Sequence, residues 1–232
     1  EFRVSQEFSP ELWNPVTGEI RYLPDFKSKE GNISLPVELE GNESAFIVFR
    51  KNNKLTETKD NFPQKVTVCK INTPWRITFE AGKRGRETPV VWSQLKDWMN
   101  SENDSIKYFS GQAVYETTFT LEKLPQKNLY IDLGNVMVMA KVTLNGQYVG
   151  GVWTFPYRLN VTGYLKEGEN KLEITVVNNW QNRLIGDQRL PEDQRLTWTT
   201  INPWKADSSL QSSGLLGPVE IQAFDYKIVK PE

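Results

Sequence analysis

Tryptophan, asparagine, arginine and aspartate side chains that suit sugar binding gather in one stretch of the sequence, residues 178–216. The candidate residues are Trp180, Asn182, Arg183, Asp187, Trp198 and Trp204. An indole ring offers a large apolar face to the C–H groups of a sugar ring, and charged side chains form strong hydrogen bonds with its hydroxyls. This combination indicates a carbohydrate-binding surface, or the rim of a carbohydrate-cleaving site.

A structural interpretation of the same residues competes with the functional one. The tryptophans would cover the end of a β-sandwich, and Arg183 and Asp187 would form an ion pair that orders the loop. Composition alone favours this second interpretation, because most aromatic side chains serve packing. Both interpretations stay open at this point.

Several kinds of catalytic site are excluded by residue type. The chain has no histidine and one cysteine, Cys69. A Ser-His-Asp triad, a Cys-His pair, a histidine zinc site and an intrachain disulfide are therefore excluded. No catalytic carboxylate pair stands out among 29 acidic residues. We expect no catalytic residue, no metal ligand and no cofactor, and structural calcium is left open because no acidic cluster has calcium-loop spacing.

Composition also limits the partners. Lys plus Arg is 28 and Asp plus Glu is 29, so the net charge is −1. This balance argues against a nucleic-acid partner and against a basic membrane-binding surface. No stretch has the roughly 18 apolar residues of a membrane-spanning helix. The 38% hydrophobic and 25% charged residues are typical of a globular protein.

The elements that must position the candidate residues are strands. Apolar residues alternate with polar ones in many short segments, and Asn145-Gly146 predicts a type I′ hairpin turn. Only residues 93–100 suggest a helix, with Ser93 as N-cap. Strands without helix alternation predict an all-β, antiparallel jelly-roll β-sandwich and exclude a (β/α) barrel. The side chains expected in its core are Tyr115, Phe119, Ile131, Leu133, Val142, Leu172, Ile174 and Ile221.

Residues 178–216 contain no convincing strand and are too long for a simple connection. Their aromatic content is too high for a disordered segment. We therefore expect an ordered loop that packs over the sandwich. The polar residues 51–60 are the best linker candidate, with a hairpin loop as the alternative.

Two sets of motifs resemble known glycoside hydrolases. Residues 108–115 (YFSGQAVY), 144–146 (LNG) and 168–172 (GENKL) resemble the sugar-binding-like jelly roll of glycoside hydrolase family 2. The second set is similar to the C-terminal region of glycoside hydrolase family 106, the bacterial α-L-rhamnosidases. It comprises residues 177–187 (VNNWQNRLIGD), 190–193 (LPED) and 212–219 (SSGLLGPV), and residues 11–20 (ELWNPVTGEI) look like the segment that follows that family's catalytic barrel.

The resemblance implies a division of the chain. Residues 1–60 would end a smaller, truncated β-rich domain that follows a catalytic barrel. Residues 61–72 would be a connection, and residues 73–232 a galactose-binding-like β-sandwich. The family's catalytic glutamates lie on the barrel, so no residue of this chain inherits their role.

The expected function is that of a non-catalytic C-terminal accessory region of a secreted bacterial glycoside hydrolase, located in the periplasm or outside the cell. Its partners would be the catalytic barrel of the same polypeptide and a plant or bacterial polysaccharide, with no nucleic acid and no membrane. Two alternatives stay open: an autonomous carbohydrate-binding module and a protein-interaction β-sandwich.

Overall fold

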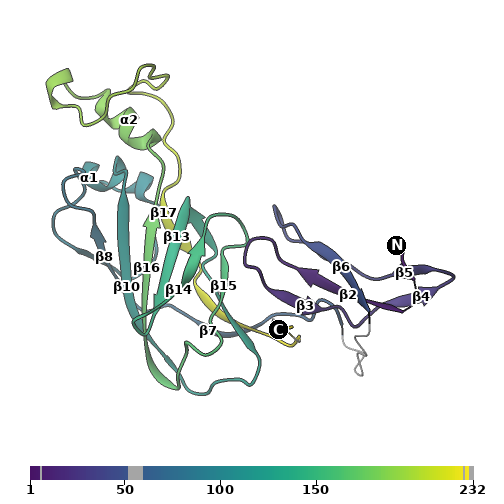
Figure 1. Cartoon of the computed structure of the whole chain (residues 1–232). Coiled ribbons are helices and arrows are strands. Elements are labelled where there is room, and N and C mark those ends of the chain that lie inside the picture. The colour runs from purple at the N-terminus through teal and green to yellow at the C-terminus, as the bar shows by residue number, and fades with distance from the viewer. Residues whose placement is uncertain (6, 52–59, 227, 230–232) are drawn as a thin grey trace.

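The computed structural model describes residues 1–5, 7–51, 60–226 and 228–229, and it is all-β, as predicted (Figure 1). Two antiparallel sheets form a sandwich, and two smaller three-stranded sheets built from the N-terminal residues lie beside it. Most of the proposed linker, residues 52–59, lies outside the described residues. No helix among the described residues is long and apolar enough to span a membrane.

The larger sheet of the sandwich has six antiparallel strands in the order β14-β13-β16-β10-β8-β9. Its strands are β8 (Trp75–Phe79), β9 (Val90–Trp92), β10 (Gln112–Leu121), β13 (Met139–Leu144), β14 (Gln147–Val152) and β16 (Gly168–Val177). The ten-residue strands β10 and β16 pair along their whole length at the centre. Asn145 and Gly146, with φ of 52° and 79°, form the predicted turn between β13 and β14.

The second sheet has four antiparallel strands in the order β15-β11-β18-β7. They are β7 (Val66–Lys70), β11 (Asn128–Asp132), β15 (Arg158–Asn160) and β18 (Glu220–Phe224), and a two-stranded ribbon joins β12 (Asn135–Met137) to β17 (Gly214–Gly217). Strand β7 corrects one expectation, since residues 61–72 were expected to be only a connection. It belongs to the sandwich because its backbone pairs with β18.

The hydrophobic core lies between these two sheets and contains all eight side chains expected there. Tyr115 and Ile174 point inward from the large sheet, and Ile131 and Ile221 point inward from the smaller one; each is 0% exposed. The alternation of apolar and polar residues therefore identified the inner face of both sheets correctly.

The N-terminal strands form two small sheets, in the orders β1-β5-β4 and β3-β2-β6. They are β1 (Phe2–Arg3), β2 (Phe8–Trp13), β3 (Ile20–Tyr22), β4 (Lys27–Lys29), β5 (Asn32–Ser34) and β6 (Phe46–Lys51). Residues 228–229 are attached to β3, because Arg21 forms a bridge with Ile228 and the amide of Val229 donates to the carbonyl of Ile20 at 2.8 Å.

The helical elements differ from the prediction. The helix expected over residues 93–100 is only the 3₁₀ turn η1 (Trp98–Asn100), and its N-cap is Asp97 rather than Ser93. Trp98 is fully buried, so core packing determines where this turn forms. The helices α1 (Asp104–Lys107) and α2 (Gln181–Asp187) and the 3₁₀ turn η2 (Glu192–Gln194) were not predicted.

Candidate functional site

The segment that carries the six candidate residues lies within the described residues and projects from the end of the sandwich where α1 lies (Figure 1). The α2 segment comprises residues 178–213; the strand-free stretch that was expected to reach residue 216 ends three residues earlier, because β17 begins at Gly214. Gly186 packs against α1's neighbour Tyr108, and a Cβ at this glycine would lie 2.7 Å from the Cβ of that tyrosine. The segment is therefore seated tightly on the sandwich.

Asn182 ties the beginning of the α2 segment to its end. Its side-chain amide donates to the carbonyl of Gln211 at 2.7 Å, and its side-chain oxygen accepts from the amide of Gln211 at 2.8 Å. A further bond of 3.2 Å reaches the hydroxyl of Ser213. Asn182 is 0% exposed, so these bonds hold the segment closed.

Arg183 and Asp187 form the ion pair that the structural interpretation expected. Nη2 of Arg183 lies 2.9 Å from Oδ1 of Asp187, one helical turn further on. Both side chains are buried, and burial lowers the pKa of Arg183 despite the attraction of Asp187.

The second oxygen of Asp187 anchors the far side of the segment. It accepts from the amides of Leu196 and Thr197 at 3.0 and 2.8 Å, and from the hydroxyl of Thr197 at 2.6 Å. Asp187 therefore holds α2 to the chain that follows η2.

The tryptophans of the segment are placed differently from these polar residues. Trp180 and Trp198 are 69% and 85% exposed, and Trp204 is half-buried. The structure therefore brings Asn182, Arg183 and Asp187 inside the segment and leaves two tryptophans outside. Their assignment to carbohydrate binding or to an active-site rim stays a prediction.

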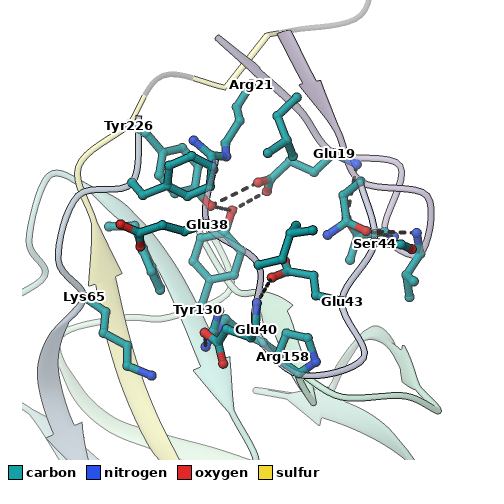
Figure 2. A pocket seen from close by; sticks show the side chains of 18 of the residues that line it. Glu19, Arg21, Glu38, Glu40, Glu43, Ser44, Lys65, Tyr130, Arg158 and Tyr226 are labelled. Carbon is teal, nitrogen blue, oxygen red and sulfur yellow. Dashed lines mark hydrogen bonds and ion pairs between the residues drawn. The ribbon is translucent and has the colours of Figure 1, made fainter. Parts of the chain in front are cut away.

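A second candidate site, which the sequence did not suggest, is a cavity of about 860 Å³ between the N-terminal strands and the sandwich. Its walls are the β2–β3 turn, residues 36–44 and 60–65, and outward-facing side chains of β11, β15 and β18. Figure 2 shows charged and aromatic side chains from both parts of the chain around this hollow.

Glu19 is the centre of a hydrogen-bonded cluster in the cavity wall. It accepts from the hydroxyl of Tyr130, and Oη of Tyr226 lies 3.1 Å from its other oxygen. The two tyrosine hydroxyls are 2.7 Å apart, and Asn160 donates to Glu19 at 3.2 Å. Burial, followed by the charge of Glu19, raises the pKa of Tyr226 above its ordinary value.

Two arginines complete the walls. The guanidinium of Arg21 lies 4.7 Å from the ring centre of Phe62 and 4.8 Å from that of Tyr226. Arg158 donates to Asp132 and to Glu40, and their two negative charges outweigh burial and raise its pKa. These contacts join the N-terminal strands to the sandwich.

Residues 92–210, half of the chain, match the family model described as glycosyl hydrolase 2 galactose-binding domain-like. The chain belongs to this family. Its galactose-binding-like fold and its β-sandwich are thus confirmed by sequence as well as by structure.

Two relatives of this galactose-binding-like chain are much longer than it. The protein named "Putative beta-glucuronidase" from Formosa agariphila is 44% identical over 60% of this chain, which spans only 14% of that protein. The solved structure of a rhamnosidase from Novosphingobium sp. PP1Y matches 95% of this chain with a TM-score of 0.85 and 35% identity. This chain corresponds to 21% of that structure.

Proposed function

We propose that this chain is the non-catalytic C-terminal accessory region of a secreted bacterial glycoside hydrolase of the α-L-rhamnosidase type, family 106. It would support the catalytic barrel of the same polypeptide and act in the periplasm or outside the cell. A plant or bacterial polysaccharide would be the substrate of the whole enzyme.

The main support for this proposal is the match to the rhamnosidase structure over 95% of the chain. The match extends well beyond the sandwich and takes in the N-terminal strands, so it concerns the arrangement of both parts. This chain corresponds to only 21% of that rhamnosidase, so most of an enzyme of this type lies outside the matched part and can include the catalytic domain.

The α2 segment offers a surface on which that domain could rest. Trp180, Trp198 and Ile201 are 69%, 85% and 81% exposed, although burying such side chains is favourable by roughly 1.5–3 kcal/mol each. Sugar binding would also need polar groups beside the indoles, but Asn182 and Asp187 are engaged within the segment. The geometry therefore favours protein contact over glycan contact on this surface.

The absence of catalysis is tested with the purified 232-residue chain and a p-nitrophenyl α-L-rhamnoside. We expect no turnover above the buffer rate. Turnover that persists through repeated purification would contradict the accessory role.

The docking surface is tested in the complete enzyme with Trp198→Ser. We expect this variant to have a lower Tm than the unmodified enzyme. We also expect protease to cleave it faster where the α2 segment meets the barrel. Trp153→Ser is the matched control, since Trp153 is 63% exposed but lies outside the α2 segment. Equal behaviour of both variants would contradict docking through Trp198, and weaker glycan binding at unchanged Tm would favour the carbohydrate-binding module instead.

A further inference from the structure

The cavity between the N-terminal strands and the sandwich is separate from the α2 segment. None of the six candidate residues lines it. Its volume of about 860 Å³ lies within the range of ligand pockets, roughly 300–1,000 Å³. The proposed role of the α2 segment therefore does not account for this cavity.

Arg158 supplies a fixed hydrogen-bond donor on the sandwich side of the cavity. Its guanidinium is held by Asp132 at 3.1 Å and Glu40 at 3.0 Å, and it lies 5.2 Å from the ring centre of Phe224. Its Nη1 donates to no other described residue and is available to a ligand. A donor that is already held in place loses little freedom when a ligand binds.

Acceptors face the same space from the N-terminal side. Glu43 receives the amide of Glu40 on one carboxylate oxygen at 2.8 Å, while its other oxygen accepts from no described residue. Glu38 is exposed on the same wall (Figure 2). Carboxylates accept strongly from hydroxyl groups, and a sugar presents several of these.

The cavity lining also contains apolar and aromatic side chains beside these charged groups. Tyr130 and Phe224 pack edge to face, with ring centres 5.2 Å apart, and Phe155 lines another part of the cavity. Leu39, which is 51% exposed, lines it from the N-terminal side. Such a lining offers both C–H contacts and hydrogen bonds, as a sugar ring requires.

The charge of the lining selects among sugars. The acidic lining residues are Glu19, Asp25, Glu38, Glu40, Glu43 and Asp60. The basic ones are Arg21, Lys65 and Arg158. Among the described residues of the lining, six carboxylates against three cations give an excess of three negative charges, which repels a uronate. We propose that this cavity binds a neutral sugar or a short neutral oligosaccharide, independently of the catalytic site and of the α2 segment.

The test is an NMR titration of the isotope-labelled 232-residue chain with L-rhamnose, D-galactose, D-galacturonate and spermidine. We expect a neutral sugar to shift the amides of β11, β15 and residues 36–44. We expect D-galacturonate to bind at least about tenfold more weakly than D-galactose, the effect of roughly one unfavourable charge contact.

Two tryptophan substitutions on the same stretch localise the site. Leu39→Trp places a large ring in the cavity lining and should change the affinity for sugar by at least about tenfold, downward where the ring fills the space of the sugar and upward where it stacks on it. Val37→Trp is the matched control, because Val37 is 44% exposed and does not line the cavity. It should leave binding within about twofold. Arg158→Lys, checked for unchanged Tm, keeps the charge but loses the planar fork, and it should weaken binding.

Four results would overturn the proposal. They are shifts confined to the α2 segment, uronate binding as tight as galactose, binding of spermidine but of no sugar, and equal affinity of the two tryptophan variants. None of them bears on whether the chain is an accessory region, because that is measured by turnover and by barrel contact.

Discussion

Removal of the Asp187 carboxylate should loosen the α2 segment, because the chain that follows η2 is then no longer held to α2. The carboxylate is 1% exposed, pairs with Arg183 and accepts three hydrogen bonds from Leu196 and Thr197. In Asp187→Ala, the buried guanidinium loses its counter-charge and three donors lose their acceptor. We expect the chain beyond η2 to detach first, because Leu196 is already 45% exposed and can exchange protein contacts for water.

The magnitude follows from the buried pair. Removing one partner of a buried ion pair costs about 3–5 kcal/mol of folding stability. Local detachment limits this loss, because water then reaches Arg183 and the freed donors. We therefore expect the free energy of unfolding to fall by about 3 kcal/mol, the lower end of that range.

Arg183→Met distinguishes the contribution of the ion pair to stability from that of the hydrogen bonds that Asp187 accepts. Asp187 keeps its three donors in this variant, so the stability loss should be smaller than in Asp187→Ala. Asp193→Ala is the control, since Asp193 lies in η2 of the same segment but is exposed.

Denaturant unfolding and amide hydrogen exchange at Leu196 and Thr197 measure the two effects. Asp187→Ala should abolish protection of both amides, and Asp193→Ala should preserve it. Unchanged protection and stability in Asp187→Ala would refute the anchoring role. In the complete enzyme, a fall in kcat/KM for Arg183→Ala at unchanged Tm would assign the pair to an active-site rim instead.

Three further predictions concern the sandwich and the cavity wall. Gly134→Ala places a Cβ 2.3 Å from the carbonyl carbon of Gly217 and should cost about 1–3 kcal/mol more than Gly146→Ala, which meets nothing within 4 Å; equal losses in unfolding experiments would contradict this. Tyr115→Phe removes the acceptor of Trp98 Nε1 (2.6 Å) and of the Leu215 amide (3.2 Å). It should cost about 1–3 kcal/mol for each orphaned donor, against almost nothing for exposed Tyr148→Phe. Tyr226 has a raised pKa, so above its ordinary value of 10.0 the folded chain holds more protons than the unfolded one and stability falls as pH rises. Tyr226→Phe should make the decrease in Tm above about pH 10 shallower, and an unaltered slope would contradict this.

The sandwich could be predicted because its signals are local. In β10, the side chains of Ala113, Tyr115 and Phe119 are buried while their neighbours face outward. The Asn145-Gly146 turn follows equally from two adjacent residues. Neither inference needed knowledge of distant parts of the chain.

The helical elements lack such local signals. α2 has Trp180 at its N-cap without a side-chain hydrogen bond, and it contains a glycine. Its stability comes from Tyr108 and from Asp187's contacts to Thr197, which are tertiary. Strand β7 is similar, because its place in the sandwich depends on β18, about 150 residues further along the chain.

Local sequence patterns do not reveal the cavity, because the residues of its walls lie far apart in the sequence. The same long-range contacts also matter for ligand binding. Glu19 meets Tyr130 across 111 residues and Tyr226 across 207. Each of the three lies in or next to a short strand, and nothing in its local sequence shows that the folded chain brings it to the other two. The backbone bond from Val229 to Ile20 then ties the wall that carries Glu19 to residues that follow β18 of the sandwich. The walls are thus held by hydrogen bonds from both sides before any ligand arrives, and this is the condition under which weak contacts with a neutral sugar can add up to measurable affinity.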